Sequence, residues 1–428
     1  MIAAVSDARF PVKLHFVGIG GAGMAPLALL AHSRGCRISG SDCEAGTKTA
    51  ELERHGIRAV IGHAAANVPD DTEMVVYSSA VPADNPERQA ALRRHIPQMR
   101  RGEFLALLAT GYRRVTAISG AHGKSSTTAM IAHILTACGS SPAFLIGAEM
   151  NGVGSFSSGG RDRDVFVTEV DESDGTHTFI KAELGVVPNI EEDHAWSVGG
   201  VEALMRNFAE FGSHCRQLIY CSGTNTDRIF AAHPSAVRLV NSAEEYLGYF
   251  GFQAANARLA VAAVEHLGVP REQAEAAART FPGIGRRMTE RHRSPELIIV
   301  EDYAHHPSEI AAAVQLLRHK YPERHLRVLI QPHRYARLEY FFDGFKRELA
   351  KADSVLVLPV FAAWSESGRV DGAALAAALP NAKYFAGSWQ ETAIAATLPC
   401  PDGKPLLLAV LGAGDIERIF KYLPGQIG

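Results

Sequence analysis

The chain has 428 residues, 47% of them hydrophobic and 21% charged, and a formal net charge of −3. This composition is typical of a soluble protein with two or three domains and argues against a general nucleic-acid binder, which would carry a basic face. The six cysteines include no C-x-x-C pair, so neither a zinc site nor a disulfide framework is indicated, and a reducing cytoplasm is expected. No signal-peptide core or apolar run of roughly 18 residues is present, so neither secretion nor a membrane span is expected.

A glycine-rich turn follows the first predicted strand. Residues 13–17 read as a buried strand that runs into Gly18-Ile-Gly-Gly-Ala-Gly23 and then into a helix over residues 24–33. A second strand, residues 36–38, leads to Asp42, near the position that holds a ribose hydroxyl in dinucleotide-binding folds. A lone pattern of this kind indicates a phosphate at a helix N-terminus and does not identify the nucleotide. A dehydrogenase therefore stays an alternative at this point.

Further α/β elements follow in order: a helix over residues 49–55, strands over 59–61 and 74–77, and a helix over 101–108. Ser78 and Ser79 stand at the carboxyl end of a predicted strand, where open α/β sheets bind ligands. An ordinary serine turn is an equally simple interpretation of this pair.

A second glycine turn predicts a nucleotide triphosphate site. The strand over residues 115–118 breaks into Gly120-Ala-His-Gly-Lys124-Ser125, and an apolar helix over residues 129–135 follows. The glycines and the helix N-terminus can present N–H groups to phosphate oxygens, Lys124 adds a charge, and the Ser125 hydroxyl can bind Mg²⁺. The turn is shorter than the full G-x-x-x-x-G-K-[ST] pattern, so an accidental Gly-Lys-Ser turn is the alternative.

Two acidic clusters follow the next predicted strands, residues 165–170 and 184–187. Their members are Glu169, Asp171, Glu172 and Asp174 in the first, and Asn189, Asp193 and His194 in the second. Such groups beside a phosphate loop suit Mg²⁺ ions that bridge phosphates. Exposed acidic turns explain Asp171, Glu172 and Asp174 equally well, whereas Glu169 and His194 are the stronger candidates.

A third α/β unit is predicted near the C-terminus. Helices over residues 201–211 and 253–267 flank residues 223–248, which are expected to be short and irregular. Arg286 and Arg287 then suit phosphate or carboxylate clamping, although solvated surface arginines are equally common. The predicted strands cover residues 297–300, 326–330, 354–360 and 406–411, and polar residues follow the first two: Asp302, Tyr303, His305, His306, Gln331, His333, Arg334 and Arg337. Polar clusters at strand ends in all three units predict a shared crevice.

These motifs, in this order, resemble the Mur ligase family, and within it the alanine-adding branch, over nearly the whole chain. The stretches that carry the resemblance are residues 15–24, 39–42, 78–80, 84–86, 120–128, 169–174, 189 with 193–194, 286–287, 302–307 and 331–334. The resemblance implies three consecutive α/β domains: a Rossmann-like UDP-sugar domain over residues 1–107, a shortened central P-loop ATPase domain over 108–293, and a Rossmann-like domain over 294–428. The last would close on ATP and the amino acid.

The resemblance also implies the reaction. It is an ATP-dependent ligation of the carboxylate of UDP-N-acetylmuramate to L-alanine through an acyl phosphate, as a step of peptidoglycan precursor synthesis in the cytoplasm. Mg²⁺ or Mn²⁺ would serve as cofactor and ATP as co-substrate. No nucleic acid or membrane partner is expected, and the protein would be a monomer or a homodimer.

Carried over position by position, the resemblance assigns four ligand-binding sets of residues and one catalytic set. The UDP-sugar would contact Gly18, Gly20, Gly21, Ala22, Gly23, Met24, Ser41, Asp42, His63, Ser79 and Ala80. ATP would contact Gly120, His122, Gly123, Lys124, Ser125, Ser126, Asn189, Phe252, Gln253, Asn256, Arg287 and Asp302. The amino acid would meet Tyr303, His305, His333 and Arg337, and the metal would be held by Ser125, Glu169 and His194. Lys124, Glu169, His194 and Arg337 form the implied catalytic set.

Several positions depart from the family pattern. Ala121 and Ser125 stand where threonine is usual, and Phe252-Gln253 stands where a His-Asn pair contacts adenine. Residues 223–248 are shorter than the family's segment, so the central sheet is expected to be trimmed at one edge. Two other functions therefore stay open: a related ligase that attaches another amine or a tripeptide in murein recycling, and an inactive paralogue that binds a UDP-muramyl nucleotide.

Overall fold

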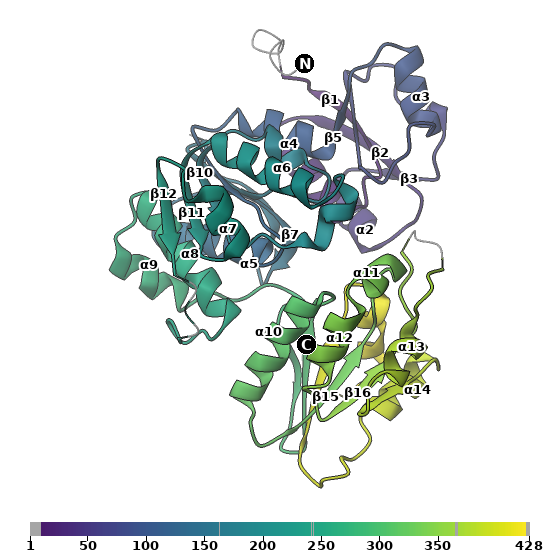
Figure 1. Ribbon diagram of the computed structural model, residues 1–428. Coiled ribbons are helices and arrows are strands. Elements are labelled where there is room, and N and C mark those ends of the chain that lie inside the picture. Colours follow the sequence, from purple (N-terminus) through teal and green to yellow (C-terminus); the bar gives the residue numbers. More distant parts are fainter. Residues whose placement is uncertain (1–9, 162, 241, 243, 364–366, 425–428) are drawn as a thin grey trace. The chain divides into compact units, whose positions relative to one another are not determined.

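The computed structural model describes residues 10–161, 163–240, 242, 244–363 and 367–424, which form three β-sheets flanked by helices (Figure 1). The first two sheets belong to one compact unit and the third to another, and the main division along the chain lies between residues 282 and 283. The predicted α/β class is thereby confirmed. None of the described helices has the length and apolarity that a bilayer crossing requires.

The first sheet is parallel, in the order β3-β2-β1-β4-β5. Its strands are β1 (Lys13–Val17), β2 (Arg37–Asp42), β3 (Ala59–Ile61), β4 (Met74–Tyr77) and β5 (Gln98–Arg100), with helices α1 (Met24–Ser33), α2 (Thr47–Arg54) and α3 (Pro86–Arg93) and the 3₁₀ turn η2 (Ala65–Asn67). β2 continues beyond its predicted end because its polar residues still pair with β1. Gly40 permits this close pairing, since a Cβ there would lie 2.6 Å from the carbonyl oxygen of Phe16.

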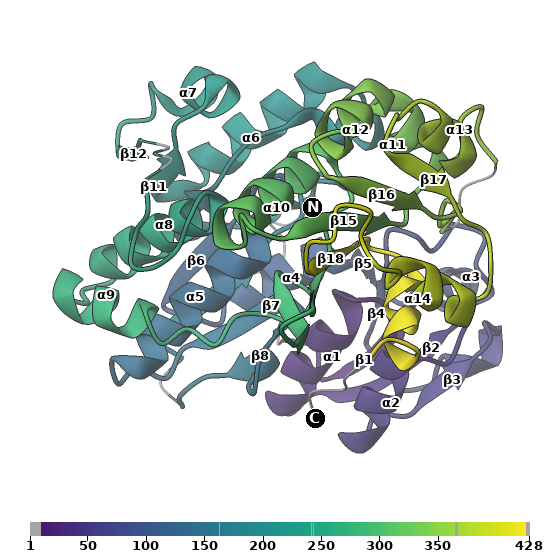
Figure 2. The ribbon, with the colours of Figure 1, turned by 90° about the horizontal axis from the view of Figure 1, so that it is seen from below.

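The second sheet has the order β12-β11-β10-β6-β9-β7-β8, and within it only the β7–β8 pair is antiparallel among the described strands. Its strands are β6 (Arg114–Ile118), β7 (Ala143–Met150), β8 (Gly154–Ser158), β9 (Val165–Glu169), β10 (Ala182–Val187), β11 (Cys215–Cys221) and β12 (Ala236–Leu239). The helical elements are α5 (Lys124–Ala137), η3 (Thr176–Phe179), η4 (Glu192–Ser197), α6 (Val201–Ser213), α7 (Thr224–Phe230), α8 (Phe252–His266) and α9 (Arg271–Ala278). Helix α5 packs against α9, β7 and β9. Figure 2 shows α5 beside β7.

The expectation of an irregular segment over residues 223–248 is wrong for residues 224–230 and 236–239, which form a helix and a strand. Helix α7 begins directly after Gly223, and β12 adds a parallel edge strand beside β11. Both guanidinium contacts of Arg238 go to the carboxylate of Asp227, at 2.7 and 3.0 Å, which ties the strand to the helix. A strand of only four residues is too short to give a clear period-2 signal.

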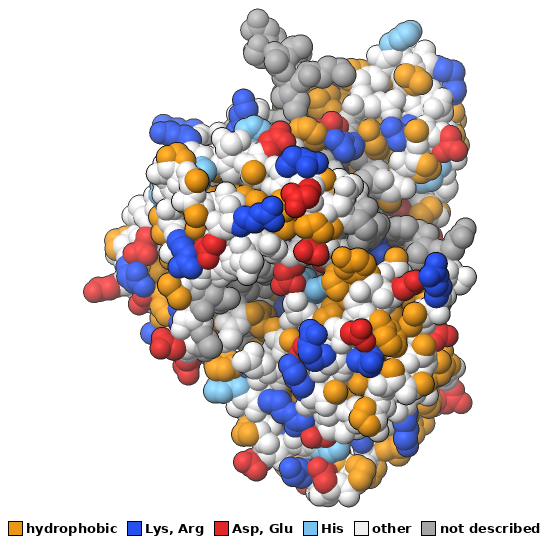
Figure 3. Space-filling view, in the orientation of Figure 1, with side chains coloured by type: hydrophobic (Ala, Val, Ile, Leu, Met, Phe, Trp, Pro, Cys, Tyr) orange, Lys and Arg blue, Asp and Glu red, His pale blue; other side chains and the backbone are white. Residues whose placement is uncertain are grey.

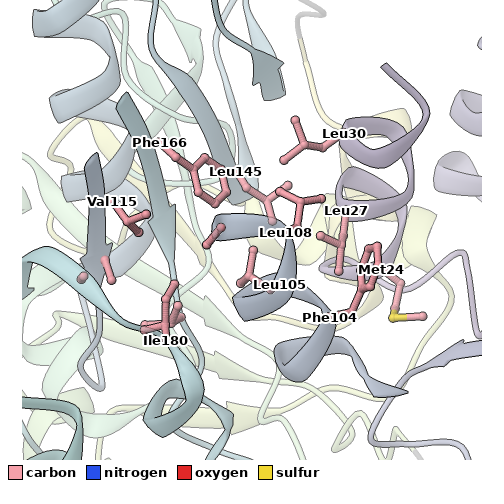
Figure 4. Close-up of a cluster of buried hydrophobic side chains, with 14 of the residues drawn as sticks. Met24, Leu27, Leu30, Phe104, Leu105, Leu108, Val115, Leu145, Phe166 and Ile180 are labelled. Carbon is pink, nitrogen blue, oxygen red and sulfur yellow. The ribbon is translucent and has the colours of Figure 1, made fainter. Parts of the chain in front are cut away.

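Helix α4 (Arg101–Ala109) joins the first two sheets into one hydrophobic core (Figure 4). Phe104, Leu105 and Leu108 are almost completely buried. In the close-up they lie between the leucines of α1 on one side and Val115 and Phe166 of the second sheet on the other. This shared core explains why the first two sheets form a single unit.

The third sheet has the order β13-β14-β18-β15-β16-β17, in which β13 is antiparallel to β14. Its strands are β13 (Thr289–Arg293), β14 (Leu297–Asp302), β15 (His325–Ile330), β16 (Ser354–Val357), β17 (Ala382–Tyr384) and β18 (Leu406–Leu411). The helical elements are α10 (Pro307–Lys320), α11 (Tyr335–Tyr340), α12 (Phe342–Leu349), α13 (Gly372–Ala377), α14 (Trp389–Ala396) and η5 (Asp415–Lys421). The all-apolar β18 is buried along its whole length, as expected for a central parallel strand covered on both faces.

Charged side chains of both signs are interspersed over the face drawn in Figure 3. This distribution agrees with the small net charge of −3. Recognition of an anionic substrate must therefore come from local groups rather than from a basic surface.

Candidate functional site

The phosphate loop lies between β6 and α5, where the sequence predicts it. Gly120 has φ +146° and Gly123 has φ +82°, and a Cβ at these positions would lie 2.7 Å from the backbone oxygen of Asn189 and 2.6 Å from Oδ1 of Asn256. Glycine is therefore required at both positions by conformation and by space. Helix α5 begins at Lys124 itself, so the loop opens directly onto a helix N-terminus, an arrangement suited to anions.

Asn189 holds the loop through its side chain. Its Oδ1 accepts a hydrogen bond from the backbone N–H of His122 at 2.9 Å, and its Nδ2 donates to the backbone oxygen of His122 at 3.0 Å. The His122 ring lies 3.4 Å from the carboxylate of Glu191. The structure thus brings Asn189 to the loop, where it shapes the backbone.

Ser125 and Glu169 present two oxygens side by side. The Ser125 hydroxyl donates to Oε2 of Glu169 at 2.5 Å, and the backbone N–H of Gly147 donates to Oε1 at 2.6 Å. A Cβ at Gly147 would lie 2.1 Å from that Oε1, so only glycine leaves room for the carboxylate. A hydroxyl next to a carboxylate is a hard-oxygen donor set that fits Mg²⁺. The third predicted ligand is His194, whose side chain lies outside the described part of the structure.

Lys124 forms a buried ion pair with Glu172. The two charged groups are 2.8 Å apart, and Lys124 also donates to the backbone oxygen of Gly120 at 2.6 Å. Burial by itself would lower the pKa of Lys124, but the negative charges of Glu172 and Asp171 outweigh this effect and raise the pKa. Burial raises the pKa of Glu172 to about 7 although Lys124 opposes this. The interpretation of Glu172 as an exposed turn residue is wrong, because its side chain is only 2% exposed.

Arg101 lies between the first glycine turn and Asp171, and its role was not predicted. Its Nη2 lies 3.2 Å from Oδ2 of Asp171, and a Cβ at Gly23 would lie 3.1 Å from its Cδ atom. Burial alone would raise the pKa of Asp171, but Arg101 and Lys124 outweigh it and lower the pKa. Asp171 therefore stays ionised beside Lys124. A lone arginine at a helix start carries no sequence signal that could have identified this link.

The N-terminal glycine turn is closed by backbone and side-chain hydrogen bonds. The N–H groups of Gly18 and Ile19 donate to the backbone oxygen of Ser41 at 2.9 Å, and that of Gly20 donates to Oδ2 of Asp42 at 2.7 Å. Gly18 has φ +78°, which glycine adopts without strain. The predicted UDP-sugar residues of β1 and β2 thus lie together at the carboxyl edge of the first sheet.

Glu87 is buried beneath this edge and was missed by sequence reasoning. Its carboxylate is 0% exposed and accepts hydrogen bonds from Ser41 Oγ at 2.5 Å, Asn67 Nδ2 at 2.6 Å and His15 Nε2 at 3.1 Å. Burial alone would raise the pKa of Glu87, but the hydrogen bonds from His15, Ser41 and Asn67 outweigh it and lower the pKa to about 2. His63 lies at the same carboxylate, with Nδ1 3.4 Å from Oε1. The Asn-Pro-Glu capping pattern at α3 was the only available signal.

In the second unit, Arg287, Asp302 and Glu309 form a charged group in which Asp302 is buried and the other two side chains are partly buried. Arg287 Nη1 lies 3.0 Å from Oε1 of Glu309, and the Asp302 carboxylate accepts from the backbone N–H groups of Met288 and Ala304, both at 2.8 Å. Burial raises the pKa of Asp302 to about 6 although Arg287 opposes this. Burial by itself would lower the pKa of Arg287, but the negative charges of Glu309 and Asp302 outweigh this effect and raise the pKa.

The four residues predicted for the amino acid lie together in this unit. The ring centroids of Tyr303 and His305 are 5.3 Å apart, those of His305 and His333 are 5.6 Å apart, and Nη1 of the buried Arg337 lies 3.2 Å from Nδ1 of His333. A guanidinium can only donate, so Nδ1 of His333 accepts and its proton lies on Nε2. Glu309 also reaches this group, since its Oε2 lies 3.2 Å from Nδ1 of His305.

Other predicted positions are placed without a contact that tests their role. Ser79 and Ala80 are exposed after β4, and Ala22 is exposed within the glycine turn. Phe252, Gln253 and Asn256 all lie in the first turns of α8, and Ser126 in the first turn of α5. Their assignment to ligands stays a prediction.

Comparisons with known proteins support the same family throughout the chain. Three family descriptions match in order: "Mur ligase family, catalytic domain" over residues 13–113, "Mur ligase middle domain" over 118–263 and "Mur ligase, glutamate ligase domain" over 286–413. A UDP-N-acetylmuramate–L-alanine ligase from Gloeobacter violaceus is 34% identical over 96% of this chain and 95% of its own length.

Solved structures agree in fold. A UDP-N-acetylmuramate-alanine ligase from Thermotoga maritima, 25% identical, matches 96% of this chain and 97% of its own with a TM-score of 0.80. A murein peptide ligase from Psychrobacter arcticus, 21% identical, matches 96% of this chain and 98% of its own with a TM-score of 0.69. The three sheets follow one another along the chain in the order of the three matched descriptions, and the phosphate loop lies in the middle one. This protein therefore belongs to the Mur ligase family of ATP-dependent, amide-forming ligases of peptidoglycan precursor synthesis.

Proposed function

We propose that this ligase joins the carboxylate of UDP-N-acetylmuramate to the amino group of L-alanine and converts ATP to ADP and phosphate. One observation carries the proposal. Tyr303, His305, His333 and Arg337 form a compact group with a buried guanidinium, of a size and charge suited to a small amino acid. The relative from Gloeobacter violaceus, named for this substrate pair, supports the same assignment.

In the first step the sugar carboxylate would attack the γ-phosphorus of ATP, which yields an acyl phosphate and ADP. Lys124 would place a positive charge against the phosphate oxygens, and the N–H groups of the loop would hold them in position. Ser125 and Glu169 would hold Mg²⁺, which neutralises developing negative charge when it is bound. The protein contributes positioning and electrostatics, and no covalent intermediate with the chain is required.

In the second step the amino group of L-alanine would attack the acyl carbon. The bond to the phosphate oxygen breaks, phosphate leaves, and the amine loses a proton as the amide forms. Arg337 would hold the α-carboxylate of the amino acid through two parallel hydrogen bonds. Glu309 fixes the His305 ring and Arg287 at the edge of this group.

The alternatives from the sequence lead to different substrates. A ligase that adds a tripeptide would need room beyond Arg337, and the murein peptide ligase from Psychrobacter arcticus shares the fold. An inactive UDP-muramyl-binding paralogue would have no use for the ion pair of Lys124 or the oxygens of Ser125 and Glu169. We further infer a cytoplasmic location, since all six cysteines are free thiols, and expect a monomer or a homodimer.

The test is phosphate release from ATP in the presence of UDP-N-acetylmuramate and Mg²⁺. Reactions without an amine, with L-alanine, L-serine or glycine, and with the murein tripeptide are compared. We expect release that depends on L-alanine. Release only with the tripeptide would replace the proposal by the recycling ligase, and UDP-N-acetylmuramate binding without any turnover would replace it by the paralogue.

A further inference from the structure

The buried carboxylate of Glu87 determines which nitrogen of His63 carries the proton. Oε2 of Glu87 accepts the only hydrogen of the Ser41 hydroxyl, at 2.5 Å. Toward His63 Nδ1, 3.0 Å away, the Ser41 oxygen can therefore only accept. The second neighbour of Nδ1 is Oε1 of Glu87, at 3.4 Å, which is also an acceptor.

Two acceptors facing Nδ1 require a proton on that nitrogen. In the neutral imidazole the other nitrogen, Nε2, is then an acceptor. The His63 side chain is 23% exposed, and within the described part of the chain no residue forms a hydrogen bond with Nε2. The ring therefore offers a single oriented acceptor at the carboxyl edge of the first sheet.

The remaining contacts of Glu87 keep this arrangement in place. Asn67 Nδ2 donates to Oε1 at 2.6 Å, the backbone N–H of Ala64 donates at 3.2 Å, and His15 Nε2 meets Oε2 at 3.1 Å. Glu87 also lies in the first turn of α3, where the helix dipole favours a negative charge. Asn67 and Ala64 donate to Oε1 and Ser41 donates to Oε2, so both carboxylate oxygens act as acceptors.

The strand order suggests which part of a nucleotide would meet His63. In dinucleotide-binding sheets the diphosphate lies at the turn after the first strand and the ribose at the end of the second. Here the glycine turn follows β1, Asp42 ends β2, and His63 comes two residues after β3, the strand outside β2. A nucleotide that follows this course places its base at β3.

We propose that Glu87 is a positioning residue that fixes the Nδ1–H tautomer of His63, so that Nε2 accepts a hydrogen bond from a ring N–H of the nucleotide base. Uracil has such a donor at N3, whereas cytosine has an acceptor at the same place. The inference rests on the proposed function, because it takes a UDP-sugar as the ligand of this sheet. It makes the Glu87–His63 pair a determinant of base specificity.

Calorimetric binding to the full chain tests the proposal with UDP, CDP and N3-methyl-UDP as probes. We expect CDP and N3-methyl-UDP to bind about tenfold to a hundredfold more weakly than UDP, because each leaves Nε2 without its donor. Since a methyl group can also clash, the same three probes are measured with His63→Ala, in which the difference between UDP and CDP should disappear. An unchanged UDP preference in His63→Ala would overturn the proposal.

The role of Glu87 is measured by ¹⁵N NMR of the His63 ring without nucleotide. The wild-type chain should show a protonated Nδ1 and an unprotonated Nε2, and Glu87→Gln should redistribute the proton and reduce the UDP-over-CDP preference. Glu51→Gln, which removes a partly buried carboxylate paired with Lys48, is the matched control and should change neither. A proton on Nε2 in the wild-type chain would overturn the inference, whereas failure of UDP to bind at all would overturn the proposed substrate instead.

Discussion

The hydroxyl of Ser125 lies 2.5 Å from Oε2 of Glu169. Ser125 lies on α5, the helix that begins at the phosphate loop, and Glu169 ends the neighbouring strand β9. Two residues 44 positions apart thus form one pair of oxygens. The pair depends on a third position, because the other carboxylate oxygen accepts from the backbone of Gly147.

Gly147→Ala should disable this oxygen pair while the fold is retained. The new Cβ would lie 2.1 Å from Oε1 of Glu169, so the carboxylate must move away from Ser125. We expect the Mg²⁺ concentration for half-maximal phosphate release to rise about tenfold or more. Gly46→Ala is the control, since nothing lies within 4 Å of a Cβ there. An unchanged Mg²⁺ dependence would exclude Glu169 as a metal ligand.

Lys124→Ala should lower kcat by about a hundredfold to a thousandfold, because it removes the charge that faces the transferring phosphoryl group. Binding of UDP, measured by calorimetry, should stay within about twofold, since Lys124 lies at the second sheet and the glycine turn at the first. Lys181→Ala removes an exposed lysine of the same unit and serves as control. Equal loss of ATP turnover and UDP binding would contradict the assignment of the two sites to different sheets.

Glu87→Gln should alter how stability depends on pH. Folding lowers the pKa of Glu87 from its ordinary 4.5 to about 2, so the ionised carboxylate stabilises the folded state above pH 4.5 and loses this contribution as the pH falls toward 2. At neutral pH the shift corresponds to about 3 kcal/mol. Urea unfolding midpoints at several pH values should therefore show a difference between wild type and variant that shrinks with acidification. A constant difference would mean that Glu87 is not ionised in the folded chain.

Arg337→Ala should raise the KM for the amino acid by about tenfold to a hundredfold, because a carboxylate loses its paired donors. The KM for ATP should change little. Arg337→Lys should recover only part of the loss, since an ammonium lacks the planar fork. Arg369→Ala removes a largely exposed arginine of the same unit and is the control. A KM for the amino acid that stays at the wild-type value would remove Arg337 from the substrate site.

Strongly patterned elements could be predicted from the sequence with correct bounds. β1, β3, β4, β18 and α1 begin and end where expected, because each combines an apolar run with a clear break. Among the missed strands are β7, β11 and β13, together with β5, β8 and β17, and β12 was taken for an irregular stretch. β7 and β11 lie inside the second sheet, and β12 and β13 lie at sheet edges. Strand formation at all four depends on side-chain packing against neighbouring strands, which local patterns do not contain.

The residues of the candidate sites also fall into two groups: those that a sequence motif identifies and those that only the fold reveals. Lys124, Ser125 and Glu169 stand in motifs whose residue types are typical of phosphate and Mg²⁺ binding, and the structure brings Ser125 and Glu169 together beside Lys124. Glu87 and Arg101 were not found, since neither was recognised as part of a motif and only the fold brings them to their partners, 46 and 70 residues away respectively. Glu172 looked like a surface acid because sequence alone does not show burial. Domain bounds stay a prediction, and the one placed after residue 107 falls inside α4.

The packing of α4 between two sheets determines which fragments of the chain can fold by themselves. A fragment that ends at residue 107 would split this helix and expose Phe104 and Leu105, side chains that the intact unit shields from water. Such a piece would aggregate or melt rather than bind nucleotide-sugar by itself. A fragment that ends at residue 282 keeps both sheets and their common interior, and we expect it to retain the binding of the nucleotide-sugar.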